Sequence, residues 1–138
     1  MHNRRMIVPA GMENIVERYH YAPGVLVGDT LYVSGQVGRD AQLQVVPDPE
    51  AQFVQAFDNV GKVLHAAGVG FEHVVELETW HTYFPGDLPL FMQVKDRYLK
   101  GPVYPTWSGF GVASLSMPGL RVEIRVRAIV PATGGSGR

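Results

Sequence analysis

The last strand of the chain is marked by a strict alternation of apolar and charged side chains. Apolar residues occupy every second position from Leu120 to Val130. The positions between them carry one carboxylate and three guanidinium groups: Arg121, Glu123, Arg125 and Arg127. This period predicts a β-strand with one face on a core. From the strand alone we favour a solvated or interfacial row of ion pairs for the other face. The alternative is a ligand site in which the flanking arginines hold Glu123 in its charged form.

Two segments have the three- and four-residue spacing of an amphipathic helix. Asp48 is suited to cap the first helix, Pro49 fits its first turn, and Gly68 is expected to end it. The second helix is expected to begin near Asp87 and to end before residue 101. Each helix has a single apolar stripe, so each needs a sheet or another helix to cover it.

The remaining periodic segments predict strands. Residues 25–27 and 31–37 form a hairpin signal, residues 6–8 suggest a short edge strand, and residues 10–20 read as a loop or a short helical turn. In the β-rich segment 74–84, Val75, Leu77, Thr79, His81 and Tyr83 are expected to share one face. Gly35 and Gly38 predict a bulge or the close approach of another group.

Together these elements predict one α+β domain over residues 1–131, with a mixed sheet and both helices on one face. Residues 132–138 are expected to be a flexible C-terminal tail. One face of the sheet would remain uncovered, with Trp80 and the segment beginning at Ser108 on it. Such a face is commonly covered by oligomerisation, and grooves between subunits are natural ligand sites.

Composition narrows the function classes. The 138 residues carry a formal net charge of -1, which gives no field that would recruit nucleic acid or an acidic membrane surface. There is no cysteine, so disulfides, thiolate nucleophiles and cysteine metal sites are excluded. No apolar run is long enough to span a membrane, and no apolar segment follows the basic N-terminus, so we expect no signal peptide and a cytoplasmic location.

Candidate chemistry is sparse. None of the five histidines has metal-ligand spacing, so no metal site is predicted, and His81 is interpreted as a core residue. Ser34 lacks the setting of a nucleophile and is more plausible as a hydroxyl donor to a ligand. Aromatic residues such as Trp107 are able to stack on a planar ligand, although aromatics in strands more often belong to a core or an interface.

Several stretches together resemble the RidA (YjgF) family, the reactive intermediate deaminases. They are the hairpin from Tyr21 to Gly38 with its Ser-Gly-Gln block at 34–36, the helix segments 55–60 and 63–68, the strand beginning at Val74, residues 91–98, and the Val-Glu-Ile run at 122–124. The resemblance covers roughly residues 20–131, and the order and spacing of these blocks are fairly specific for the family.

The resemblance implies a chorismate-mutase-like fold and a homotrimer with clefts between subunits. It also implies a small-molecule ligand in those clefts and hydrolysis of 2-imino or enamine acids to 2-keto acids and ammonia, without a cofactor. By the same resemblance Glu123 positions the attacking water, while Tyr21 and Ser34 line the cleft.

One family position departs from the pattern. Where the family has an arginine that binds the substrate carboxylate, this chain has Trp107, followed by Ser108. An indole offers one donor and an apolar face in place of a bidentate fork. Lys95 also stands where the family has an asparagine. Either another basic group, such as Arg121, Arg125 or Lys95, reaches the cleft, or the ligand is larger and flatter and stacks on Trp107. We favour the second alternative.

The sequence therefore predicts an enamine or imine deaminase-like hydrolase with altered substrate scope. In this interpretation Glu123 is catalytic, and Tyr21, Ser34, Trp107 and Ser108 bind substrate. The alternative is a non-catalytic small-molecule-binding protein with the same cleft. An endoribonuclease is a distant third, because the chain is not basic and offers no pair of acid and base histidines.

Overall fold

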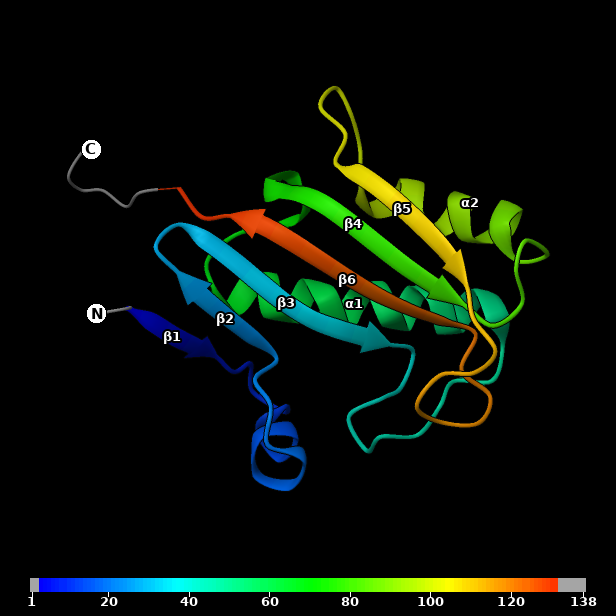
Figure 1. The fold of residues 1–138 in the computed structure, drawn as a ribbon, viewed down its shortest axis with the longest axis horizontal. Helices are drawn as coiled ribbons and strands as arrows, with labels where there is room; N and C mark the ends of the chain where they lie inside the picture. The colour runs from blue at the N-terminus through cyan, green and yellow to red at the C-terminus, as the bar shows by residue number, and fades with distance from the viewer. Residues whose placement is uncertain (1–2, 132–138) are drawn as a thin grey trace.

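In the computed structural model, which describes residues 3–131, six strands form one mixed sheet in the order β1-β2-β3-β6-β4-β5 (Figure 1). The strands are β1 (Arg4–Ile7), β2 (Gly24–Val27), β3 (Thr30–Val37), β4 (Val74–His81), β5 (Thr106–Gly111) and β6 (Val122–Ile129). Only the pairing of β4 with β5 is parallel. The predicted α+β class with a mixed sheet is confirmed, while the tail predicted at 132–138 lies outside the described residues.

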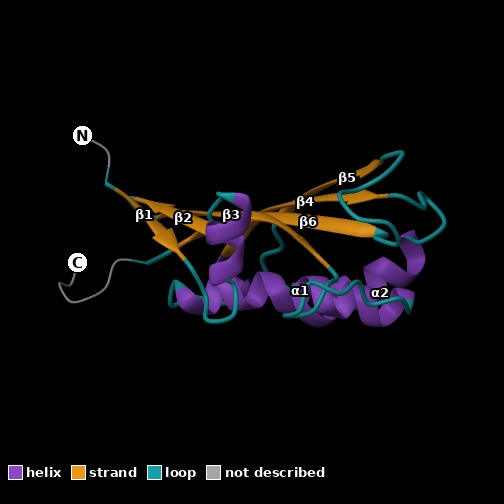
Figure 2. Cartoon of the chain, turned by 90° about the horizontal axis from the view of Figure 1, so that it is seen from below, coloured by secondary structure: helices purple, strands orange, loops and turns teal. Residues whose placement is uncertain are grey.

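Two long helices, α1 (Pro49–Ala66) and α2 (Leu88–Tyr98), cover one face of the sheet and leave the other face bare (Figure 2). The first begins as predicted, because a side-chain oxygen of Asp48 accepts a hydrogen bond from the backbone N–H of Ala51 at 2.9 Å. Gly68 follows the helix with a φ of 83°, as expected for a residue that ends it. Two short turns, η1 (Ile15–Tyr19) and η2 (Phe71–His73), complete the described elements.

The core lies between the sheet and the two helices. Phe53, Phe57 and Phe91 are fully buried there, and the ring of Phe91 contacts the rings of the other two. Alternate residues of β6, from Val122 to Ala128, are buried against them, so the predicted apolar face of this strand is confirmed.

A bulge in β4 makes one prediction wrong. The register with β6 shifts between Val74 and Glu76, so Val74 is buried and Val75 is exposed. The expected alternation therefore holds only from Leu77 to His81, because the inserted residue turns the start of the strand by one position. Tyr83, predicted on the same face, lies beyond the end of β4 and is exposed, so that part of the prediction is also wrong.

Both glycines predicted to allow a close approach do so. A side chain at Gly35 would collide with the carboxylate of Glu123, because an added Cβ would lie 2.0 Å from Oε2. A Cβ at Gly38 would lie 2.3 Å from the backbone oxygen of Gln52 in α1. Gly35 therefore leaves room for the side chain of Glu123, a candidate catalytic residue, and Gly38 lets the chain pack closely on α1.

Among residues 3–131, the helices are too short or too polar to cross a membrane.

Candidate functional site

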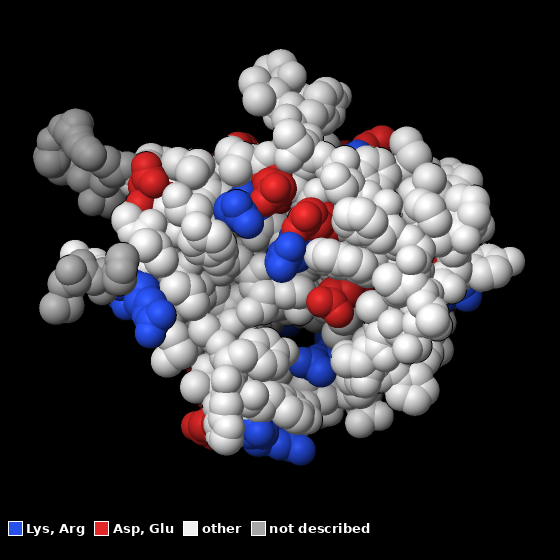
Figure 3. Space-filling view, in the orientation of Figure 1, with Lys and Arg blue, Asp and Glu red and all other residues white. Residues whose placement is uncertain are grey.

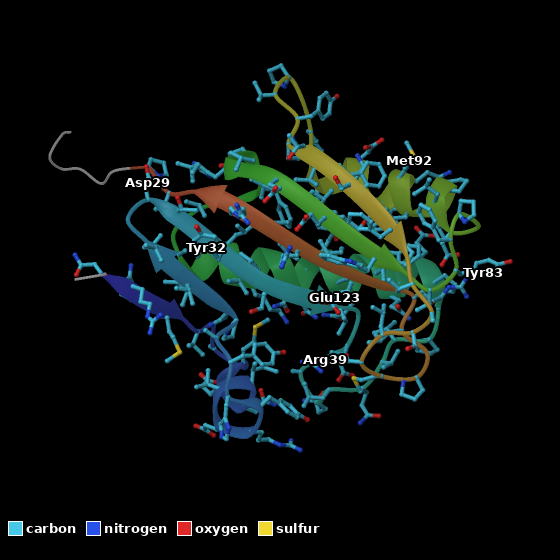
Figure 4. All side chains as sticks on the ribbon, in the orientation of Figure 1. Asp29, Tyr32, Arg39, Tyr83, Met92 and Glu123 are labelled. Atoms are coloured by element: carbon cyan, nitrogen blue, oxygen red, sulfur yellow. The ribbon has the colours of Figure 1, made fainter. Side chains whose placement is uncertain are left out.

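A surface hollow lies where the end of β3 runs beside the beginning of β6. It is lined by Tyr21, Ser34, Gly35, Val37, Arg39, Ser116 and Glu123. Glu123 and Arg39 lie near each other beside this hollow (Figure 4), and the molecular surface is hollowed at the same place (Figure 3). Three of the five residues predicted for the site, Tyr21, Ser34 and Glu123, thus meet in one chain. We call this feature the Glu123 hollow.

The electrostatics of Glu123 differ from the expectation. Desolvation by burial raises the pKa of its carboxyl above the ordinary value, and this exceeds the lowering by Arg125 and Arg39. Arg121 was predicted to hold the carboxylate charged, but its Nε and Nη2 instead donate to Asp87 at 2.8 and 2.6 Å. Glu123 is therefore a more basic carboxylate than a solvated one, which suits a group that accepts a proton from water.

A bulge shapes the wall opposite Glu123. The register between β3 and β6 shifts between Val33 and Gln36, which places Ser34 and Gly35 in the irregular segment. The Ser34 hydroxyl donates to the carbonyl of Ala22 at 2.6 Å. Because the hydroxyl proton is used in this bond, the Ser34 oxygen is left as an acceptor, whereas the sequence suggested a donor to a ligand.

His81 is a core residue, as interpreted. It is fully buried, its Nε2 lies 2.8 Å from the Thr79 hydroxyl, and burial lowers its pKa. Throughout residues 3–131, no three His, Asp or Glu side chains gather in a way that could hold a metal ion.

The comparisons with known proteins show the family and the fold of this chain. Residues 12–130 match the family model described as "Endoribonuclease L-PSP". The RutC family protein YjgH of Escherichia coli K12 is 34% identical over 131 residues, which is 95% of this chain and 98% of that protein. The chain belongs to the RidA (YjgF) family. A bovine 2-iminobutanoate/2-iminopropanoate deaminase is 38% identical over 113 residues, 79% of each chain. A solved structure of protein YJGH superposes with a TM-score of 0.86 at 34% identity, covering 94% of this chain and 98% of that one.

The RidA fold places Trp107 away from the Glu123 hollow of its own chain. Its indole N–H donates to the Thr79 hydroxyl at 3.0 Å, and its ring lies 6.0 Å from that of Phe91 on the helix side of the sheet. The ammonium of Lys95 lies 5.1 Å from the indole centroid. The one indole donor and much of the ring are therefore engaged within the chain, and stacking of Trp107 on a ligand stays a prediction.

Ser108 is the other predicted residue that one chain does not bring to the hollow. It pairs in register with Glu78, and it is exposed. Ser108 and Trp107 belong to β5, the strand at the edge of the sheet, and β4 separates them from the strand that carries Glu123.

Arg39 is the cation that sequence reasoning missed. The three basic residues predicted as substitutes for the family's arginine already have partners: Arg121 binds Asp87, Arg125 binds Glu78 and Lys95 binds Asp96. Arg39 lines the Glu123 hollow and takes part in none of the ion pairs formed within residues 3–131. The one feature of the sequence that could have pointed to Arg39 as a site residue is its position just after the Ser-Gly-Gln block at 34–36.

Proposed function

We propose that this RidA-family protein hydrolyses the C=N bond of a 2-imino acid or its enamine, with a substrate scope different from that of the better-known branch. The observation that carries the proposal is the Glu123 hollow itself. A carboxylate of raised pKa faces a bulge where glycine leaves it room, and a guanidinium without an ion-pair partner lies beside it. The deaminase activity of the bovine relative supports the same reaction class.

In the proposed reaction Glu123 accepts a proton from water while the water oxygen bonds to the imine carbon. Glu123 passes this proton to the nitrogen, which gives a tetrahedral intermediate with a hydroxyl and an amino group. The hydroxyl proton then moves, again by way of Glu123, to the nitrogen as the carbonyl forms, and the C–N bond breaks to release ammonia. The products are a 2-keto acid and ammonia, so water is the only co-reactant. The Ser34 oxygen, which lines the hollow and is left as an acceptor, is proposed to accept a hydrogen bond from the substrate nitrogen.

Arg39 is proposed to bind the substrate carboxylate in place of the family's arginine. Arg39 is half-buried, and its Nη1 donates to the thioether sulfur of Met117 at 3.6 Å. A thioether is a weak acceptor, so a carboxylate would replace it with little loss.

The assembly proposed is a homotrimer in which β5 of one subunit adjoins the Glu123 hollow of the next. The bare face of the sheet and the β5 edge carry large exposed apolar side chains: Tyr32, Val75, Val103, Tyr104, Phe110 and Ile129. Such a concentration of apolar surface is typical of an interface. In this arrangement Ser108, which is exposed on β5, would complete the cleft.

The decisive variant is Glu123→Gln, which keeps the shape of the side chain and removes the base. We expect ammonia release from freshly generated 2-iminopropanoate or 2-iminobutanoate to fall by roughly 100-fold or more, while binding of the matching 2-keto acid is retained. Unchanged turnover would exclude Glu123 as the water-activating group. If the wild-type protein binds keto acids but hydrolyses no imine, it is a binding protein.

A further inference from the structure

Three amide side chains lie along one face of α1. Gln52, Gln55 and Asn59 follow one another at three- and four-residue spacing, so they stand above one another on the helix. Gln52 and Asn59 are buried, at 0% and 6% exposure. Burying an amide costs free energy unless its polar atoms find partners. Both buried amides have such partners, and these are backbone groups of the two loops that supply Arg39 and Ser116 to the Glu123 hollow.

Asn59 holds the backbone on both sides of Gly38. Its amide nitrogen donates to the carbonyl oxygen of Val37 and to that of Arg39, each at 2.9 Å. Its amide oxygen accepts from Nε2 of Gln55 at 3.0 Å, which fixes the orientation of the amide. The two N–H groups and the oxygen of this amide are therefore all used within the chain.

The position of Arg39 depends on Asn59 more than the position of Glu123 does. Val37, the last residue of β3, pairs in register with Glu123, so the sheet itself holds this part of the hollow. Arg39 lies beyond the end of β3, and its bridge with Val45 joins two parts of the same loop. In the part of the chain that the structure describes, Asn59 is the side chain that bonds the Arg39 backbone to a helix.

Gln52 holds the other end of this loop. Its Nε2 donates to the carbonyl of Val46 at 2.9 Å and to that of Gly119 at 3.0 Å, and its Oε1 accepts from the backbone N–H of Arg121 at 2.6 Å. Because Gln52 bonds two loops at once, its loss would disturb more than one wall of the hollow. Asn59 acts on the Arg39 end alone, so it is the residue through which this contact is best tested.

The guanidinium of Arg39 lies near the carboxylate of Glu123 (Figure 4). Binding of a carboxylate by a guanidinium fork requires alignment, and a misplacement of about 1 Å costs on the order of 100-fold. The charge of Arg39 also reaches Glu123. Burial raises the pKa of the Glu123 carboxyl, and Arg125 and Arg39 lower it from that raised value. Arg125 is held by Glu78, so its effect does not depend on Asn59.

We infer that Asn59 is a positioning residue of the Glu123 hollow: by holding the Arg39 backbone against α1, it aims the guanidinium at the carboxylate of the substrate. This inference rests on the proposed function, because it takes Arg39 as the group that binds the carboxylate. It gives a part in substrate binding to a buried helix residue that does not itself line the hollow.

The test is a double-mutant cycle of Asn59→Ala and Arg39→Gln. Ammonia release from freshly generated 2-iminobutanoate and calorimetric binding of 2-oxobutanoate are measured on wild type, both single variants and the double variant. We expect Asn59→Ala to raise KM and the dissociation constant by roughly tenfold, the value of a charge-assisted hydrogen bond, while kcat above the rising limb of the pH profile stays within about twofold. In the Arg39→Gln background the same substitution should change neither constant. Equal factors in both backgrounds would overturn the inference, since Asn59 would then act independently of Arg39.

Val60→Ala is the matched control for lost stability. Val60 follows Asn59 on α1, is fully buried, and has no polar side-chain group with which to bond the loop. Both substitutions should lower the midpoint of denaturant unfolding. Asn59→Ala alone should raise KM and move the rising limb of the pH profile to higher pH, in the same direction as Arg39→Gln, because Arg39 lowers the pKa of Glu123 against the effect of burial. An unmoved limb, or equal KM values for Asn59→Ala and Val60→Ala, would overturn the inference.

Gln55→Ala keeps the inference testable if Asn59→Ala does not fold. It leaves both bonds from Asn59 to the loop in place and removes the one that orients the amide. We expect KM and the dissociation constant to rise by about threefold, and unchanged values would overturn the inference.

The failure of the proposed function is distinguishable from the failure of this inference. If wild type binds 2-oxobutanoate but hydrolyses no imine, the proposed function fails, and the dissociation constants of the same variants decide the role of Asn59. If wild type binds no 2-oxobutanoate, the inference fails as well.

Discussion

At the scale of single residues, alanine substitutions at Gly35 and Gly38 are expected to have different effects, the first on turnover and the second on stability. Gly35→Ala would push aside the Glu123 carboxylate, because the added Cβ would also lie 2.9 Å from Cγ of that residue. We expect folding to be kept and turnover to fall by roughly 100-fold, the cost of a small misplacement of a catalytic group.

Gly38→Ala is the matched control, since its Cβ would meet backbone rather than a side-chain end. It should lower the free energy of unfolding by about 1–3 kcal/mol, as overpacking does. Denaturant titration and ammonia release, measured on both variants, separate the two effects. Full activity in Gly35→Ala would show that the position of Glu123 is unimportant.

The pH dependence of the reaction follows from the charges around Glu123. Because burial raises the pKa of this carboxyl, the fraction of active carboxylate and hence turnover should rise with pH through a value above that of an ordinary glutamate. Arg39 lowers this pKa, so Arg39→Gln should move the rising limb of the profile to higher pH and raise KM.

Arg127→Gln is the control for this shift of the pH profile. Arg127 lies on β6, as Glu123 does, but it pairs with Glu76. The profiles of turnover against pH for the wild type and both variants provide the measurement. Two results would contradict the assignment of Glu123 as the base with Arg39 beside it. One is a rising limb at the pKa of an ordinary glutamate, and the other is an equal shift of the profile in Arg39→Gln and Arg127→Gln.

At the scale of elements, β5 and α2 are joined by Trp107. Trp107→Phe keeps the contact with Phe91 and removes the hydrogen bond to Thr79, so it should cost about 1 kcal/mol of stability. Trp107→Arg introduces the residue that the resemblance implies for this position but places a charge against the helix layer, and it should cost roughly 2–4 kcal/mol. Denaturant unfolding of the two variants checks this order. Equal stability of Trp107→Arg and wild type would mean that the indole does not hold β5 to α2.

Most of the fold was predictable because its signals are local. The cap at Asp48, the stop at Gly68 and the alternation in β6 each depend on neighbouring residues, and each is confirmed. The bulge at Val74 and Val75 was not predictable, because it depends on register with another strand.

The site was only partly predictable. Glu123, Ser34 and Tyr21 carried a family resemblance and meet in one hollow, but the role of Arg39 depends on which other arginines find partners. Arg121 and Arg125 bind Asp87 and Glu78, residues more than thirty positions away in the chain. Such pairings are set by the tertiary structure, so the sequence could not show which cation stays available.

At the scale of the whole molecule, the bare face of the sheet predicts assembly. Light scattering should give about three times the 15.2 kDa of one chain. Tyr32→Glu, at a residue 44% exposed on the bare face, should dissociate the trimer and reduce turnover. Met92→Glu, at a residue 42% exposed on α2, should do neither. A monomeric wild type, or a Tyr32→Glu variant that stays trimeric, would contradict the proposed assembly.

The most direct test of the central claim is the rate of ammonia release from freshly generated 2-imino acids, with wild type and Glu123→Gln compared at equal concentration and assembly state. The account predicts that wild type accelerates hydrolysis above the spontaneous rate and that Glu123→Gln returns it to near that rate. Equal acceleration by both proteins would contradict the assignment of Glu123 as the group that activates water.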